Sequence, residues 1–350
     1  MIIPNTIRAY AAIVFLLLSM AIFPCDLFAD LAWKFIVVGD SRSSSASIGN
    51  GVNTEILGEM ATEIVSQGAE FVLFPGDLVK GYVNQTTLQS QLLTWRDTIQ
   101  PVYDAGIPIY AVRGNHDVGS PAGVTAWNNI FSGAYALPGN GPAGETNLTY
   151  SVEHKNALIL GLDEYTPNHQ VNQTWVDAKL DANTQPHIFA FGHEPAFAAN
   201  HADCLDDYPS NRNSFWESLA TAGGRTYFAG HDHFYDHARI DDGDGNQDND
   251  LHQYIVGTGG APLRDWSPPY SGSNAPYTPV REYYAKQYGY VVVEIDNLNA
   301  TLTWFQRMAP GVYSATAETW SYTAVPEPST FAGLLGLCLA GLLARARRKC

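Results

Sequence analysis

Short apolar runs alternate along the chain with longer segments in which apolar residues recur every three or four positions. The runs at 34–39, 70–75 and 108–113 are rich in β-branched and aromatic residues, which is typical of strands buried inside a sheet. Segments 54–67 and 86–104, which separate these runs, carry the spacing of amphipathic helices. This alternation of strand and helix predicts parallel strands joined by helical connections.

The second half of the sequence continues the alternation and then changes to strands without helices between them. The strands expected in this half are 157–162, 187–191, 226–229, 252–256, 290–295 and 301–305, and the helices are 173–180 and 215–222. A meander that follows an alternating part predicts a layered α/β sandwich in one domain, and we see no internal repeat.

The N-terminal segment has the layout of a secretory signal peptide. Arg8 precedes an apolar run at 11–23, Pro24 breaks that run, and Ala29 is a small residue at the expected cleavage point. We therefore expect signal peptidase to remove residues 1–29. A buried first helix is the alternative interpretation of the same segment.

The C-terminal segment 325–350 contains a Pro-Glu-Pro motif, an apolar run at 331–344 and a basic tail. The run is shorter than the ~20 residues that span a bilayer comfortably, and the tail would hold its end in the cytoplasm. These parts in this order resemble the PEP-CTERM sorting signal of Gram-negative bacteria. The resemblance implies transient membrane anchoring through this helix, removal by an exosortase-like enzyme, and a final place at the cell surface or in the extracellular matrix. An ordinary membrane anchor would give the same topology without processing, and residues 313–324 are expected to be a linker.

Charge and cysteine content narrow the range of partners. Against 35 Asp and Glu the chain has 19 Lys and Arg, a formal net charge of −16. No binding to nucleic-acid backbones is expected, because such binding requires clustered Lys and Arg. Of the 4 Cys residues, Cys204 alone lies outside the two end segments, so no disulfide is expected within the body of the protein.

Five of the expected strands run directly into a glycine that is followed by residues able to bind metal ions. Glycine permits a sharp turn and a close approach of the backbone, and open α/β sheets bind ligands just beyond the carboxyl ends of their strands. Oxygen and imidazole donors together suit Mn, Fe or Zn. The junctions are GDSR at 39–42, GDLVKG at 76–81, GNHD at 114–117, GHEP at 192–195 and GHDH at 230–233, and their candidate donors are Asp40, Asp77, Asn115, His193, His231 and His233.

The junctions in this order resemble the signature of the calcineurin-like metallophosphoesterases, which reads GDxH, GDxxD or a variant, GNHD or GNHE, GH, and GHxH. The resemblance covers about residues 35–295. It implies a single-domain α/β/β/α sandwich of the metallophosphoesterase type over residues 30–312, with two metal ions of the Mn, Fe or Zn class. It further implies that one ion is held by Asp40, Asp77 and His233, and the other by Asp77, Asn115, His193 and His231, with Asp77 bridging.

By the same resemblance the chain is a secreted phosphoesterase that hydrolyses phosphate mono- or diesters. A hydroxide that bridges the two ions would attack phosphorus, and His116 would protonate the leaving oxygen as general acid. Arg42 stands where the family commonly has a histidine ligand, so the first ion is one donor short; the guanidinium either clamps phosphate oxygens or forms a salt bridge at the rim of the site. Lys80 stands where many phosphoprotein phosphatases have an aspartate that orients the catalytic histidine, which leaves Asp117 as a candidate for that role.

Two other functions are open on the same fold. The ligand missing at Arg42 favours a non-catalytic or single-metal matrix or binding protein. Another dinuclear hydrolase chemistry is the third option. Metal content measured together with turnover of phosphate esters and amides separates the three.

Three further segments carry weaker patterns. Residues 240–250 space acidic side chains like the start of a calcium-binding loop, but Gln247 and Gln253 replace the glycine and glutamate of that loop, which favours an acidic hairpin turn. A loop at 262–279, rich in Pro, Ser and Tyr, is expected at the rim of the site. Asp163, at the end of another strand, is expected to brace the site from behind.

Overall fold

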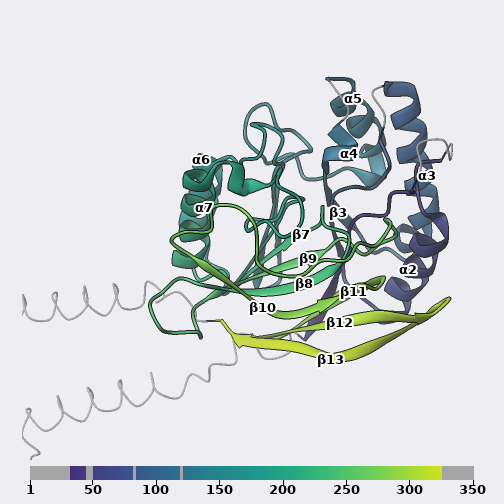
Figure 1. Cartoon of the computed structure of the whole chain (residues 1–350). Helices are drawn as coiled ribbons and strands as arrows, with labels where there is room; N and C mark the ends of the chain where they lie inside the picture. Colours follow the sequence, from purple (N-terminus) through teal and green to yellow (C-terminus); the bar gives the residue numbers. More distant parts are fainter. Residues whose placement is uncertain (1–31, 45–49, 82–83, 119–120, 325–350) are drawn as a thin grey trace, which may run out of the picture.

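Two β-sheets lie face to face at the centre of the protein, and helices cover their outer sides (Figure 1). The computed structural model describes residues 32–44, 50–81, 84–118 and 121–324. Within these residues the chain forms a single-domain α/β/β/α sandwich, and the predicted fold class is confirmed.

The first sheet has the strand order β13-β12-β11-β1-β2-β3. Its parallel part consists of β1 (Trp33–Val37), β2 (Val72–Pro75) and β3 (Ile109–Val112), and its antiparallel part of β11 (Gly289–Asp296), β12 (Asn299–Ala309) and β13 (Val312–Thr323). β1 joins the two parts, because Ile36 pairs with Val72 in parallel register while Phe35 pairs with Val293 in antiparallel register.

The second sheet has the order β10-β8-β9-β7-β6-β5-β4. Its parallel strands are β5 (Ala157–Gly161), β6 (His187–Phe191), β7 (Thr226–Ala229) and β9 (Leu251–Val256), and its antiparallel strands are β4 (Tyr150–His154), β8 (Tyr235–Asp241) and β10 (Thr278–Ala285). Parallel strands in the centre of both sheets place their carboxyl ends at one edge of the sandwich.

Helical connections carry the chain back between the parallel strands. The helices are α2 (Thr54–Gln67), α3 (Gln85–Asp104), α4 (Asn115–Val118), α5 (Pro121–Ile130), α6 (Gln173–Asp181) and α7 (Pro209–Thr221), with short 3-10 turns at Gly133–Tyr135 and Leu205–Asp207. In α2, Asn53 caps the first turn by accepting a hydrogen bond from the Ile56 amide, and Gly68 ends the helix in the left-handed conformation. These signals explain why the predicted and observed bounds of α2 agree.

An aromatic cluster joins the two sheets beneath the strand ends. The ring of Phe35 on the first sheet lies 4.8 Å from Phe71, 5.1 Å from Phe189 and 6.4 Å from Phe228, measured between ring centroids. All four side chains are fully buried. Burial of such a side chain contributes about 1.5–3 kcal/mol, so the cluster fixes the two sheets against each other and supports the loops at their edge.

Strands β4, β8, β10 and β13 go beyond the sequence-based prediction. Residues 313–324, predicted to be a linker, contain most of β13, which pairs with β12 in an antiparallel hairpin. Its Thr- and Ser-rich sequence lacks an apolar run, and its residues alternate between half-buried and exposed. Strand pairing rather than apolar composition therefore defines this element, and the prediction of a linker is wrong.

Both predicted address segments, residues 1–29 and 325–350, lie outside the described residues. None of the helices in the described part of the chain has the length and apolar character needed to cross a bilayer.

Candidate metal centre

The glycine-containing junctions follow β1, β2, β3, β6 and β7, all of them parallel members of their sheets. Their polar side chains therefore reach the same edge of the sandwich from both sheets. Short contacts link the side chains of the candidate donors there: Asp40 to His233, Asp77 to His193, and His193 to Asn115. The Asp40 carboxylate also accepts a hydrogen bond from the backbone amide of His231.

The backbone is strained at three of these positions. Asp40, Asp77 and His231 have φ angles of 59°, 52° and 69°, in the left-handed region that costs non-glycine residues of order 1–3 kcal/mol. Neighbouring glycines make room for their side chains. A Cβ on Gly114 would lie 2.3 Å from Asp77 Oδ1, and one on Gly230 would lie 2.2 Å from Asp40 Oδ2. The chain thus uses unfavourable backbone conformations to direct these donors inward.

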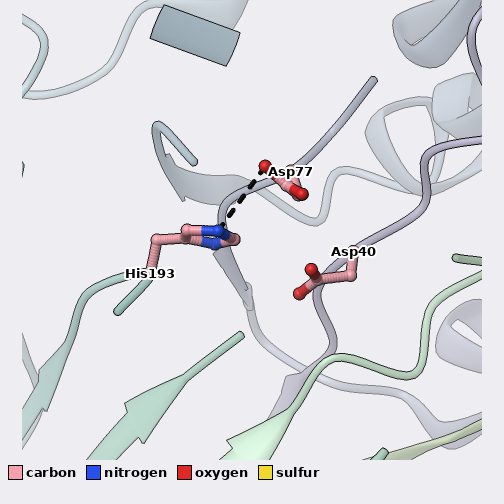
Figure 2. Close-up of side chains that lie close together, drawn as sticks. All are labelled: Asp40, Asp77 and His193. Carbon is pink, nitrogen blue, oxygen red and sulfur yellow. Dashed lines mark ion pairs between the residues drawn. The ribbon is translucent and has the colours of Figure 1, made fainter. Parts of the chain in front are cut away.

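Asp40, Asp77 and His193 form the centre of the cluster (Figure 2). Each offers one ligand atom, and these three atoms lie within 4.8 Å of one another. His193 Nε2 is 3.5 Å from Asp77 Oδ1, and neither side chain is more than 1% exposed. Buried charges of this kind are normally paired or bound to a metal ion.

The hydrogen bond of His193 defines its tautomer. Its Nδ1 lies 2.9 Å from the carbonyl oxygen of Pro75. A carbonyl only accepts, so Nδ1 carries the proton, and burial lowers the pKa of His193 to about 4, which keeps the ring neutral. Nε2 therefore presents a lone pair to two oxygens, Asp77 Oδ1 at 3.5 Å and Asn115 Oδ1 at 3.2 Å. Electron-rich atoms that face one another without a proton between them indicate a site for a cation.

His233 repeats this arrangement on the other side of the cluster. Its Nδ1 lies 3.0 Å from the carbonyl oxygen of Pro262, and its Nε2 is 3.6 Å from Asp40 Oδ1. Burial and the charge of Arg42 lower the pKa of His233 to about 3, so this ring is neutral as well. Pro262 belongs to the loop predicted at the rim, and its carbonyl orients a donor directly.

These separations suit metal coordination. Two ligand atoms bound to one ion by bonds of ~2.1 Å at a tetrahedral angle are ~3.4 Å apart. The observed gaps of 3.5 Å and 3.6 Å between imidazole nitrogen and carboxylate oxygen match that value. Carboxylate, amide and imidazole donors without thiolate suit Mn, Fe or Zn, so the residues present fit the metal ions that the sequence predicts.

The pKa values of Asp40 and Asp77 are shifted in opposite directions. Burial and the negative charge of Asp77 raise the pKa of Asp40 well above its usual value. Burial also opposes ionisation of Asp77, but His193, His116 and Arg42 outweigh it and lower the pKa of Asp77 to about 2. Asp77 is therefore the permanently ionised member of the pair.

His231 is held by the loop that follows the GHEP junction. Its Nε2 lies 3.4 Å from Asp203 Oδ1, and its ring centroid is 4.5 Å from that of His201. Burial alone would lower the pKa of His231, but the bond to Asp203 reverses the shift and raises it. Asp232 is not part of the cluster, because its carboxylate accepts a hydrogen bond from the Asn200 amide and contacts His201.

His116 stands at the edge of the cluster on α4. Its amide donates to Asp77 Oδ1 at 3.0 Å, and its Nδ1 lies 2.7 Å from the carbonyl oxygen of Lys80. Nε2 is 3.9 Å from Asp77 Oδ2, and a quarter of the side chain is exposed. The carbonyl of Lys80 thus orients the ring, at the position where the sequence offers no carboxylate for that purpose.

Asp117 does not contact the His116 ring. Its carboxylate accepts hydrogen bonds from the amides of Leu78, Val79 and Gly114, which ties the second junction to the third. Asp117 lies on the helical turn α4, where neighbouring side chains diverge by a helical step. Burial, with the charge of Asp77, raises the pKa of Asp117 to about 8. Its contacts are those of a structural brace.

Arg42 enters the cluster rather than its exposed rim. Its Nε lies 3.3 Å from Asp77 Oδ2, and the two side chains are 8% and 1% exposed. Of the two interpretations of this residue, the salt bridge is present, but it is buried beside the most acidic donor of the site.

Two acidic residues behind the cluster have separate structural roles. Asp163 forms a buried bidentate ion pair with Arg113, which directly precedes the third junction. Glu164 accepts hydrogen bonds from the amides of His193 and Glu194, at 2.7 and 2.6 Å. The sequence predicted a brace at Asp163, but only the structure shows that Glu164 holds the turn that carries His193.

The acidic segment 240–250 forms the turn of the β8–β9 hairpin. Carboxylate oxygens of Asp241, Asp242 and Asp250 lie within 4.8 Å of one another. Arg239 is ion-paired with both Asp241 and Asp250, so the cluster already has a cation of its own.

Comparisons with known families and structures agree with this geometry. The family model described as calcineurin-like phosphoesterase matches residues 34–235, more than half of the chain. A PEP-CTERM protein-sorting motif matches residues 324–349. No curated protein matches the sequence significantly.

Several solved structures share the fold. A purple acid phosphatase from yellow lupin seeds has a TM-score of 0.62 at 15% identity over 83% of this chain and 54% of its own. A dimetal phosphatase from Danio rerio has a TM-score of 0.53 at 13% identity over 84% and 99%. GAP50, the anchor in the inner membrane complex of Plasmodium, has a TM-score of 0.57 at 14% identity over 85% and 90%. The chain spans about half the length of the lupin protein, and identities this low establish the fold alone.

Proposed function

The chain belongs to the calcineurin-like phosphoesterase family, and we propose that it is an exported, metal-dependent hydrolase of phosphate mono- or diesters. One observation carries the proposal: the neutral His193 points an unprotonated Nε2 at Oδ1 of the buried, ionised Asp77, 3.5 Å away. A structural network would place a proton in that gap, whereas a metal centre requires it to be free of one.

The donors divide into two groups around Asp77. Asp77, Asn115, His193 and His231 would hold one ion, and a second position lies between Asp40, Asp77 and His233. Metal ions held by these donors would supply Lewis-acid activation of a phosphate ester and of the attacking water.

Arg42 and His116 supply the remaining chemistry. The buried guanidinium of Arg42 sits beside Asp77 and can bind two phosphate oxygens, which fixes the ester and stabilises charge on it as the reaction proceeds. His116 keeps a proton on Nδ1 through the carbonyl of Lys80, so when doubly protonated it can give the Nε2 proton to the departing alcohol. Part of this ring is exposed, as a proton donor to substrate requires.

Export follows from the C-terminal motif. The PEP-CTERM match at 324–349 indicates a surface or extracellular location, and exosortase processing is part of the proposal. Because the motif begins at residue 324, directly after β13 ends at Thr323, removal would leave the sandwich and its site intact.

The test is hydrolysis by the purified protein. It is metal-depleted, then supplied with Mn²⁺, Zn²⁺ or Fe²⁺ and offered a panel of phosphate monoesters, diesters, nucleotides and carboxylic amides. Turnover of phosphate esters that disappears in Asp77→Asn supports the proposal. Asp244→Asn, which neutralises an exposed carboxylate in the β8–β9 turn, is the matched control and keeps full activity. Absence of turnover with every ester and metal, in folded protein that binds metal, refutes it in favour of a non-catalytic metal-binding protein.

A further inference from the structure

We propose that the centre binds one metal ion tightly, at Asp77, Asn115, His193 and His231, and that the guanidinium of Arg42 takes the place of a tightly bound second ion. This inference rests on the metal-binding part of the proposed function and specifies its stoichiometry. The two groups of donors that share Asp77 are unequal, and the inequality has three parts.

The first part is that the two carboxylate oxygens of Asp77 face different partners. Its Oδ1 faces His193 Nε2 at 3.5 Å and accepts a hydrogen bond from the His116 amide. Its Oδ2 faces Arg42 Nε at 3.3 Å. A second ion would need Oδ2 of Asp77, and this oxygen is already paired with the guanidinium of Arg42.

The second part is the number of donors. On the side of His193, Nε2 of that ring faces Asp77 and Asn115, and the ring of His231 lies 5.0 Å away between centroids. With His231 this side has four candidate donors, the number that Zn sites have. On the other side, the donors among the described residues are Asp40 and His233 besides the shared Asp77. Both oxygens of Asp40 also accept from the His231 amide, at 3.2 and 3.1 Å, which satisfies part of that carboxylate without an ion.

The third part is that the charge of Arg42 is permanent and confined. An arginine does not lose its proton in proteins, so it cannot become a ligand and repels a nearby divalent ion at every accessible pH. The side chain is 8% exposed, and its backbone pairs with Val52 in a β-bridge. Within the described residues its buried Nε has no partner of hydrogen-bond geometry, and its 3.3 Å contact is the ion pair with Asp77 Oδ2.

The consequence for catalysis is a mixed clamp. A phosphate group would be held between one bound ion on the His193 side and the guanidinium on the Asp40 side. Arg42 gives planar, directional contacts to phosphate oxygens, whereas a second ion would give a more strongly charged but exchangeable one. His233 and Asp40 then position Arg42 and the substrate rather than an ion.

The experiment measures metal content, independently of activity. Wild-type protein and Arg42→His are loaded with excess Mn²⁺, dialysed against metal-free buffer, and analysed by elemental analysis and electron paramagnetic resonance. We expect about one Mn per wild-type chain, with the hyperfine pattern of an isolated ion. Arg42→His supplies the missing imidazole and removes the repelling charge, so it should retain about two Mn per chain with the spectrum of an exchange-coupled pair.

Arg264→His is the matched control. Arg264 is exposed, and its amide donates to the carbonyl of His233, so the variant makes the same chemical change near the site without adding a donor to the cluster. It should retain about one Mn. Circular dichroism and thermal melting verify that each variant is folded, and Arg42→Leu, which removes the charge without adding a ligand, provides a second comparison that should also retain about one ion.

Two coupled ions in the wild-type protein overturn the inference, as does a folded Arg42→His that still binds only one. Hydrolysis is scored separately. One ion with ester turnover supports both proposals, one ion without turnover removes only the proposed function, and two ions with turnover removes only the inference.

Discussion

Replacing Asp40 by asparagine is expected to stabilise the metal-free protein and to lose that advantage when metal binds. Asp40 and Asp77 offer oxygens within 4.8 Å of each other, and both side chains are buried. In the absence of a cation this arrangement is unfavourable. Asparagine has nearly the same shape and still accepts a hydrogen bond, but it carries no charge.

The size of the effect follows from Coulomb's law. Two unit charges at 4.8 Å repel by about 3 kcal/mol at an effective dielectric constant of ~20. Asparagine loses about 1 kcal/mol of hydrogen-bond stabilisation, because only one of its terminal atoms can accept from the His231 amide. A net gain of about 2 kcal/mol corresponds to roughly 4–8 °C in the melting temperature of a domain of this size.

The pH dependence of this gain has a defined sign. Burial and Asp77 raise the pKa of Asp40 in the folded chain above its unfolded value. The ionisation of Asp40 therefore lowers stability progressively as pH rises from the unfolded pKa through the folded one. Asp40→Asn does not titrate, so its advantage over wild type is small in acid and largest above the folded pKa of Asp40.

Melting curves of the two proteins are compared in EDTA and in saturating Mn²⁺, each at about pH 5 and pH 8. A metal ion bound by Asp77 offsets the charge of that carboxylate and weakens its repulsion of Asp40, so in Mn²⁺ the variant should lose its advantage over wild type. Asp163→Asn is the control, because it breaks a buried ion pair with Arg113 away from the donors and should cost about 3–5 kcal/mol with or without metal. If metal-free Asp40→Asn melts at or below wild type at pH 8, the repulsion between the carboxylates is not what the geometry indicates.

Three further results are expected. His116→Gln should lower kcat by ~10²–10⁴ with metal content unchanged, whereas simultaneous loss of metal would assign the ring to the ligands. Glu164→Ala leaves the amides of His193 and Glu194 and the Tyr227 hydroxyl without their acceptor, so it should lower the free energy of urea unfolding by about 3–6 kcal/mol. Glu164→Gln keeps an acceptor and should cost much less, and equal effects of the two variants would contradict this role. Reductant should leave the melting temperature unchanged, because Cys204 is a free, buried thiol, and a large decrease would reveal an undetected disulfide.

Strand ends could be predicted well because two signals coincide at each of them. A buried apolar run such as 187–191 has few alternatives to a central strand, and the glycine after it marks where the sheet stops. Once the strands are parallel, topology alone gathers the residues that follow them at one edge. The neighbourhood of Asp77 and His193 therefore follows from local pattern combined with one rule about parallel sheets.

Partners of the donors could not be predicted in the same way. Carbonyl groups of Pro75 and Pro262 define the tautomers of His193 and His233, and a carbonyl leaves no mark in the sequence. Glu164 acts on the backbone of a turn that is distant in the chain, so no spacing reveals it. Elements such as β13 form by strand pairing at a sheet edge and lack the apolar run on which the prediction depended.

Arg42 shows how one substitution changes the meaning of a conserved-looking cluster of donors. In sequence it reads as a missing ligand, which suggests a weakened version of a two-ion site. In the structure His193, His116 and Arg42 together lower the pKa of Asp77 to about 2, whereas burial and the charge of Asp77 raise the pKa of Asp40. The guanidinium is paired with Oδ2 of Asp77, while Oδ1 is the oxygen that faces His193. The asymmetry of the site therefore depends on the position of this cation as well as on the number of ligands.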